Sequence, residues 1–293
     1  MTKTTQTDIE NGYSRRMIRT VVLGDIGTDS EVLMDCIEAI HTYRKGKYYD
    51  SKNNRIASCN MANNEIALEL CVAILVVKEI NPIQSVAAQL GNRLGYSNPL
   101  DGIKTAAEII AVCEKTGLFT LYHSTADDND TGTLGVKPNY KLSDSVEEYI
   151  EQTMYLPPMI ETPEPWKDNS NGGHLLGSGS VILGSINHHN YQQNLDSLNI
   201  IQGIEWELNE DVLEYDELSK KPLDTPEKTR QFNNLVKKSK AVYNSMIKLG
   251  NKFYFVWKYD KRGRMYSQGY HINLQSTEYK KAILQFSNKK VII

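Results

Sequence analysis

Residues 251–270 read Asn251-Lys-Phe-Tyr-Phe-Val-Trp-Lys-Tyr-Asp-Lys-Arg-Gly-Arg-Met-Tyr-Ser-Gln-Gly-Tyr270. The aromatic, β-rich run from Phe253 to Tyr259 predicts a buried or half-buried strand. The turn that follows, Asp260-Lys261-Arg262-Gly263-Arg264, carries three cations and one carboxylate. Arginines fixed at the end of a strand present planar donors that suit phosphate, and glycine lets another backbone approach closely. Two interpretations follow from these residues alone: a solvated loop, or a phosphate-binding turn.

Charge is distributed very unevenly along the chain. From Glu227 to Ile293 there are 15 Lys and Arg against three acids, a net charge of +12, whereas residues 1–226 carry −15. A basic region interleaved with aromatic residues favours a polyanion partner, most simply nucleic acid. The alternative is a basic face that docks on an acidic protein or on the acidic remainder of this chain.

The composition is typical of a globular protein with room for one large domain or two ordinary ones. The chain has 293 residues, of which 40% are hydrophobic and 24% charged. No uncharged apolar stretch approaches the length of about 18 residues that a membrane span needs. The N-terminus is polar and shows no signal peptide. We therefore expect no membrane association and a cytoplasmic location, in the host cell if a phage encodes the chain.

No local pattern predicts a metal site or a complete catalytic set. The cysteines at 36, 59, 71 and 113 form no Cys-x-x-Cys pair, which predicts reduced core residues. His188 and His189 are adjacent, so they share no face of a helix or strand. The glycines from Gly172 to Gly184 follow neither nucleotide-binding loop pattern.

Apolar periodicity and capping residues predict a mainly α fold with small β elements. A first helix is expected to start within 27–31 and to end near 44–46, and further helices are expected over about 65–80, 83–94, 99–113, 144–154, 194–208 and 226–249. Two short β-like runs predict a hairpin over about 118–136, with an acidic tip. Residues 1–25 are expected to form a flexible arm and a short apolar segment, and residues 48–60 a loop.

Four segments, in order, resemble the amino-terminal half of single-subunit DNA-dependent RNA polymerases of the phage and mitochondrial type. Asp260–Tyr266 matches the family's Asp-x-x-Gly-Arg motif, which opens the palm. Met154–Trp166, followed by Gly172-Gly173-His174, resembles its Pro-Met … Pro-x-Pro-Trp … Gly-Gly segment. Asn199–Leu213 resembles its Asn-x-x-Gln-x-x-x-Trp-x-x-Asn … Val-Leu helix, and Glu114–Leu121 falls where the family has a hairpin near the upstream edge of the bubble.

By position, the resemblance implies a division into polymerase domains. Residues 61–212 would form the N-terminal domain, residues 213–250 the thumb, and residues 251–293 the start of the palm. Residues 1–60, expected to form an N-terminal arm and a helix, show no resemblance.

The resemblance also implies roles for the residues of the turn. Arg264 and Gly263 would contact the template or the RNA–DNA hybrid near the active site, and Arg262 would support phosphate binding. Asp260 would orient the arginines and pin the turn, and Tyr266 would pack under the hybrid.

Further residues are assigned in the same way. Lys237, Lys238 and Lys240 would track the backbone of the hybrid from the thumb. Trp166 and Trp206 are expected to be structural.

Other parts of the family's active site are expected on a partner. Polymerases of this type hold two Mg²⁺ ions on palm aspartates that lie well beyond the Asp-x-x-Gly-Arg motif. This sequence ends near the expected second palm strand, at Phe286–Ile293. We therefore expect one subunit of a heterodimeric enzyme, inactive alone, that binds DNA template and nascent RNA. The second subunit would carry the aspartates, the Mg²⁺ and the fingers.

The acidic tip of the predicted hairpin departs from the family pattern. Asp127, Asp128 and Asp130 stand where the family usually places an apolar residue that wedges against the upstream base pair. Carboxylates there would be repelled by DNA phosphate. A DNA-melting or single-strand-binding helper is therefore a further candidate partner.

Two other functions remain open at this point. The first is a non-enzymatic nucleic-acid-binding protein derived from a polymerase fragment, which would bind in a salt-sensitive way without a co-purifying subunit. The second is a structural protein whose basic end docks on an acidic chain, a surface for which nucleic acid would not compete.

Overall fold

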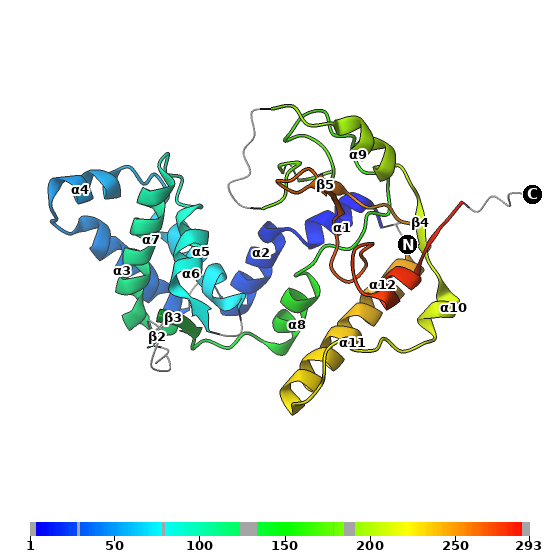
Figure 1. Ribbon diagram of the computed structural model, residues 1–293. Helices are drawn as coiled ribbons and strands as arrows, with labels where there is room; N and C mark the ends of the chain where they lie inside the picture. The colour runs from blue at the N-terminus through cyan, green and yellow to red at the C-terminus, as the bar shows by residue number, and fades with distance from the viewer. Residues whose placement is uncertain are drawn as a thin grey trace, which may run out of the picture. The chain divides into compact units, whose positions relative to one another are not determined.

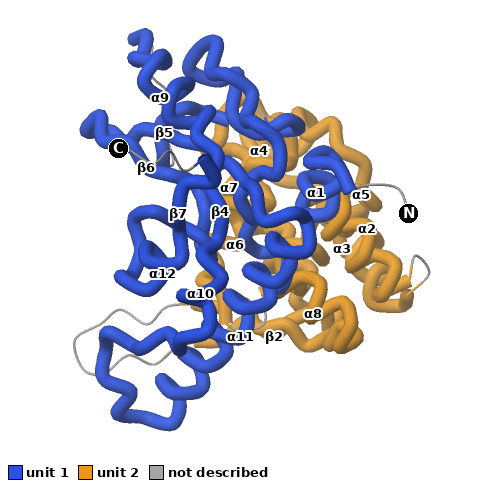
Figure 2. The backbone as a smooth tube through the Cα atoms, turned by 90° about the vertical axis from the view of Figure 1, so that its right-hand side faces the viewer, with its two compact units in different colours: residues 1–14, 152–293 blue, residues 15–151 orange. Residues whose placement is uncertain are grey.

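The computed structural model describes residues 4–27, 30–77, 80–123, 134–177, 179–184 and 191–288. The chain divides into two compact units, residues 15–151 and residues 1–14 with 152–293 (Figure 2). Across the described ranges the regular structure is mainly helical with small antiparallel sheets, so the predicted fold class is confirmed at this level (Figure 1). In the described ranges, no helix is long and apolar enough to cross a membrane. The division into polymerase domains stays a prediction.

The unit of residues 15–151 is organised around helix α5 (Asn63–Leu75). Every residue from Ile66 to Leu75 except Leu68 is buried, and each large apolar side chain contributes about 1.5–3 kcal/mol of burial free energy. The other helices of this unit are α2 (Arg15–Ile26), α3 (Glu31–Lys45), α4 (Asp50–Ala57), α6 (Ile83–Gly91), α7 (Pro99–Cys113), the short 3₁₀ helix η1 (Glu114–Thr116) and α8 (Asp144–Gln152).

Helices α6 and α7 contact each other through their backbones. A Cβ atom on Gly102 of α7 would lie 2.5 Å from the carbonyl oxygen of Gly91 in α6. Only glycine permits this approach, so the two helices pack more closely than side chains would allow.

The predicted hairpin is confirmed. Strand β2 (Phe119–His123) pairs antiparallel with β3 (Leu134–Pro138), with Leu121 opposite Val136. Strand β1 (Asn81–Pro82) extends this sheet in the order β1–β3–β2. The acidic tip with Asp127, Asp128 and Asp130 lies outside the described residues.

The predictions of a flexible arm with a short apolar segment over residues 1–25, and of a loop over residues 48–60, are wrong. Residues 15–26 form α2 and residues 50–57 form α4. Arg15 and Arg19 of α2 form ion pairs with the buried Glu69 of α5, at 3.4 and 3.1 Å. A local sequence pattern does not show contacts between residues so far apart in the chain. The sequence therefore did not predict α2 and α4.

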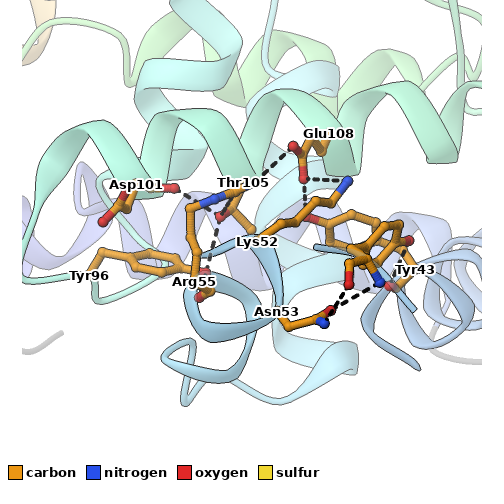
Figure 3. Close-up of polar contacts among 9 residues, drawn as sticks. Tyr43, Lys52, Asn53, Arg55, Tyr96, Asp101, Thr105 and Glu108 are labelled. Carbon is orange, nitrogen blue, oxygen red and sulfur yellow. Dashed lines mark hydrogen bonds and ion pairs between the residues drawn. The ribbon is translucent and has the colours of Figure 1, made fainter. Parts of the chain in front are cut away.

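A polar cluster fastens α4 to α7 (Figure 3). Glu108 of α7 accepts hydrogen bonds from Arg55 Nη2 at 2.8 Å and from the Tyr43 hydroxyl, and forms an ion pair with Lys52 at 3.2 Å. Arg55 Nη1 also donates to Thr105 Oγ1 at 2.5 Å. Because Glu108 has two cationic partners and a hydroxyl donor, we interpret the cluster as a structural contact.

Glu108→Gln is expected to lower the free energy of unfolding by about 1–3 kcal/mol, because it weakens charge-assisted hydrogen bonds to two cations. Burial alone would raise the pKa of Glu108, but hydrogen bonds from Tyr43, Lys52 and Arg55 outweigh it and lower that pKa. The stabilisation is therefore present above the unfolded-state pKa of about 4.3 and is lost as the pH falls through the lower folded-state value. Urea unfolding at neutral pH and near pH 3 measures both effects. The exposed Asp35→Asn serves as the control, and equal losses in the two variants would contradict the assignment.

The second unit contains α1 (Gln6–Gly12), which also replaces part of the predicted arm. Buried Glu10 accepts hydrogen bonds from the backbone N–H groups of Leu175 and Leu176, at 3.0 and 2.6 Å. The Gln6 side chain accepts one from the backbone N–H of Ile160 at 2.9 Å. These contacts fix α1 to segments more than 150 residues away in sequence.

The core of this unit is formed by the aromatic run predicted as a strand. Phe253, Phe255 and Val256 are buried, but only Trp257–Tyr259 forms a regular strand, β5. Phe253 and Tyr254 form isolated bridges instead. The other elements are α9 (Leu195–Gln202), β4 (Trp206–Leu208), α10 (Glu210–Leu213), α11 (Pro226–Lys248), β6 (Met265–Ser267), α12 (Glu278–Ala282) and β7 (Leu284–Phe286).

The helix predicted over 194–208 ends earlier than expected. Helix α9 stops at Gln202, and Trp206 lies in β4, which pairs with β7 so that Glu207 is opposite Gln285. Trp206 also exchanges backbone hydrogen bonds with Phe253, at 2.8 and 2.9 Å. Gln202 and Trp206 therefore do not share a helix face, because strand pairing overrides the local helical periodicity.

Candidate nucleic-acid interface

Strands β5 and β6 form the hairpin that carries the basic turn. Lys258 lies opposite Tyr266 in the antiparallel register. Because side chains alternate along a strand, Trp257 and Tyr259 are buried in the core while Lys258 and Tyr266 lie on the other face. The backbone of Tyr259 also bonds to residues 181 and 183, at 2.8 and 2.7 Å, so β5 is held along both edges.

The Asp260 carboxylate caps the turn from within. Its Oδ1 accepts hydrogen bonds from the backbone N–H groups of Arg262 and Arg264, both at 2.9 Å. The hydrogen bond from the backbone N–H of Arg264 lowers the pKa of Asp260, and the Arg264 guanidinium lowers it further. Gly263 has φ of +78°, a left-handed conformation that most other residues adopt only with strain. The turn is therefore fixed by its own residues.

The guanidinium of Arg264 is oriented before any ligand arrives. Its Nε and Nη2 donate to Asp260 Oδ2 at 2.7 and 2.6 Å, and its Cζ lies 5.5 Å from the centre of the Tyr266 ring. The Arg264 side chain is still 52% exposed, so part of the guanidinium stays open to solvent beside its contacts with Asp260 and Tyr266. Arg262 is 73% exposed, with its Nε 3.5 Å from the same carboxylate oxygen. The arrangement suits an anion that approaches the hairpin from solvent.

The structure brings together the five residues predicted in the turn, but not the three predicted on the helix. Asp260, Arg262, Gly263, Arg264 and Tyr266 share one hairpin. In Figures 1 and 2, α11 lies well below β5 within the same unit, so Lys237, Lys238 and Lys240 occupy a separate position.

Helix α11 is anchored at its C-terminal half only. Its buried residues are Ser239, Tyr243 and Met246, and the helix before them is largely exposed. Lys237 is exposed, Lys238 is half-buried, and Lys240 forms an ion pair with Asp216 at 3.2 Å. This acid partly offsets the charge that the helix presents to a polyanion.

The anchor of α11 is expected to weaken in mild acid. His271 and Ser239 form a buried hydrogen bond of 2.9 Å. Burial, with the nearby Lys280 and Lys238, lowers the pKa of His271 to about 4. The unfolded imidazole titrates near 6.5, so the stabilisation is present above that pH and is lost as the pH falls toward 4.

The measurement is the urea midpoint between pH 7 and pH 5. His271→Gln keeps a hydrogen-bonding side chain but cannot titrate. Its urea midpoint is therefore expected to fall less between pH 7 and pH 5 than that of the wild type. The exposed His123→Gln should leave the profile unchanged. Identical profiles for the wild type and His271→Gln would rule out this role for His271.

Buried hydrogen bonds with α9, which the sequence did not predict, support the hairpin on its core side. Gln202, 2% exposed, accepts hydrogen bonds from Trp166 Nε1 at 2.9 Å and from the backbone N–H of Trp257 at 3.1 Å. Asn199 Oδ1 accepts one from the backbone N–H of Trp166 at 2.7 Å. The available signal was the spacing of Asn199 and Gln202, which puts both on one face of α9. Trp166 is buried, in the structural position expected for it.

The described part of the chain contains no group of three or more His, Cys, Asp or Glu side chains placed to hold a metal ion. The four cysteines are free and buried in the core, as predicted. No protein-family model matches the chain, and no curated protein is significantly similar to it.

Proposed function

We propose that this chain is the nucleic-acid-binding subunit of a two-subunit DNA-directed RNA polymerase. The observation that carries the proposal is Arg264, which is held by Asp260 and Tyr266 at the tip of a supported hairpin and remains half exposed. An arginine fixed in advance loses little side-chain entropy on binding phosphate, and its planar donors give a defined geometry. Because the turn resembles the Asp-x-x-Gly-Arg motif of the polymerase family, we infer that the phosphate belongs to a DNA template or an RNA–DNA hybrid.

In this proposal the chain binds and orients nucleic acid. Arg264 and Arg262 contact phosphates, and Tyr266 packs against the strand beside them. Lys237 on α11 contributes a second, weaker contact. The partner's carboxylates hold the two Mg²⁺ ions, which supply the activation of the 3′-hydroxyl and the stabilisation of the leaving oxygen.

The distribution of ion pairs supports a polyanion partner at the hairpin. Several basic residues around α11 have nearby acids, such as Arg230 with Glu227 and Lys228 with Asp224, both at 2.7 Å. In the turn, Arg262 and Arg264 share the single carboxylate of Asp260. The excess positive charge of these two arginines favours an external anion.

Native mass spectrometry of the tagged chain, purified from the cells that make it naturally, tests the proposal. We expect a heteromeric complex with a second chain that binds Mg²⁺ and supports templated RNA synthesis. Nucleic acid bound without a second chain would favour the non-enzymatic binding protein. An acidic partner that nucleic acid does not displace would favour the structural interpretation.

A further inference from the structure

Lys258 lies beside the turn in an environment that does not balance its charge. Its Nζ lies 5.6 Å from the centre of the Trp166 ring. Burial lowers the pKa of Lys258, and no carboxylate in the described ranges forms an ion pair or hydrogen bond that would raise it again. A partly buried ammonium group without an acceptor is costly, and an external anion would offset that cost.

The space around this ammonium group is kept open by a glycine. A Cβ atom on Gly179 would lie 3.3 Å from Lys258 Nζ. A side chain at position 179 would therefore require Lys258 Nζ to shift by a few tenths of an ångström, whereas glycine leaves room beside it.

Lys258 and Arg264 lie on the same face of the hairpin. Tyr266 is the cross-strand neighbour of Lys258, and its ring packs against the Arg264 guanidinium. Lys258 precedes Asp260, the residue that holds Arg264, by two positions, which along a strand is about 7 Å. The two cations therefore originate from neighbouring positions along one face of the hairpin.

We propose that Lys258 is a second phosphate-binding residue of the hairpin, so that a nucleic-acid strand places one phosphate on Arg264 and a neighbouring phosphate on Lys258. This inference rests on the proposed function. It specifies the path of the strand: along the outer face of β5 and β6, across Tyr266 and toward Gly179. The ligand is a phosphodiester backbone, which the experiment below distinguishes from a free nucleotide.

The test is the salt dependence of binding between the full chain and a fluorescent single-stranded DNA oligonucleotide. Lys258→Met keeps the packing on Trp166 but removes the charge. We expect it to weaken binding about tenfold at low salt, the loss of one charge-assisted contact. The slope of log K against log salt should fall by about 0.7, the value for one phosphate of a single strand.

Three further variants separate charge from structure. Lys258→Arg should restore the slope. Gly179→Ala should weaken binding with the charge unchanged, because its methyl group crowds Nζ. Lys252→Met removes an exposed lysine that is paired with Glu205 at 3.1 Å, and should bind like the wild type.

The outcomes distinguish this inference from the proposed function. A wild-type slope and affinity in Lys258→Met, with weaker binding in Arg264→Ala, would overturn the role of Lys258 alone. Equal binding by the wild type and by both variants would overturn the nucleic-acid face of the hairpin as well. If a nucleoside triphosphate displaced the oligonucleotide from the wild type but not from Lys258→Met, Lys258 would be a nucleotide site and the strand path would be wrong.

Discussion

Arg264→Ala is expected to lower RNA synthesis by the two-chain complex by about 100-fold, while the two chains still assemble. Losses of this size follow when a group that positions the reacting strand is removed. The side chain is half exposed and its main partners, Asp260 and Tyr266, lie within the same hairpin, so its removal should leave the fold intact. Steady-state synthesis on a defined template, with the complex quantified by native mass spectrometry, measures both quantities.

Two further variants test whether the loss depends on the guanidinium of Arg264 itself. Arg264→Lys keeps the charge but loses the planar fork, so it should restore only part of the rate. Arg230→Ala removes an exposed arginine of α11 that pairs with Glu227, and should leave the rate near that of the wild type. An unchanged rate in Arg264→Ala would remove this residue from the site.

Gln202→Leu is expected to lower the free energy of unfolding by about 2–4 kcal/mol. The substitution leaves the buried backbone N–H of Trp257 without its side-chain acceptor and removes one of the two acceptors of Trp166 Nε1. An unpaired buried polar group costs about 1–3 kcal/mol, and the lost hydrogen bond to the indole adds to this. The denaturant midpoint of the full chain is the measurement.

Gln231→Leu is the matched control, because it makes the same change at an exposed position of α11. It should shift the midpoint little. Equal midpoints for Gln202→Leu and the wild type would show that this glutamine does not support the hairpin.

The sequence correctly predicts those elements whose structure depends on contacts between residues close together in the chain. Helix α7 begins at Pro99, as predicted, and the Asn98 side chain accepts a hydrogen bond from the backbone N–H of Leu100. Helix α11 similarly begins at Pro226 after a Thr225 cap. The turn from Asp260 to Arg264 could also be predicted from the sequence, because its hydrogen bonds join residues within five positions of one another.

Contacts between distant residues explain what the sequence did not reveal. Helix α1 is held by Glu10 and Gln6 through backbone groups of residues 160, 175 and 176. Trp206 leaves the helical pattern because its backbone pairs with Phe253. The environment of Lys258 likewise depends on Trp166 and Gly179, which lie about 80–90 residues earlier in the chain.

The central claim is that this chain contributes the nucleic-acid-binding part of a polymerase whose metal-binding carboxylates lie on a second chain. Templated RNA synthesis with Mg²⁺ and nucleotides tests it most directly, with the purified chain alone compared with the chain combined with its co-purifying partner. We expect no synthesis by the chain alone and robust synthesis by the combination. Robust synthesis by the isolated chain, or none by the combination, would contradict it.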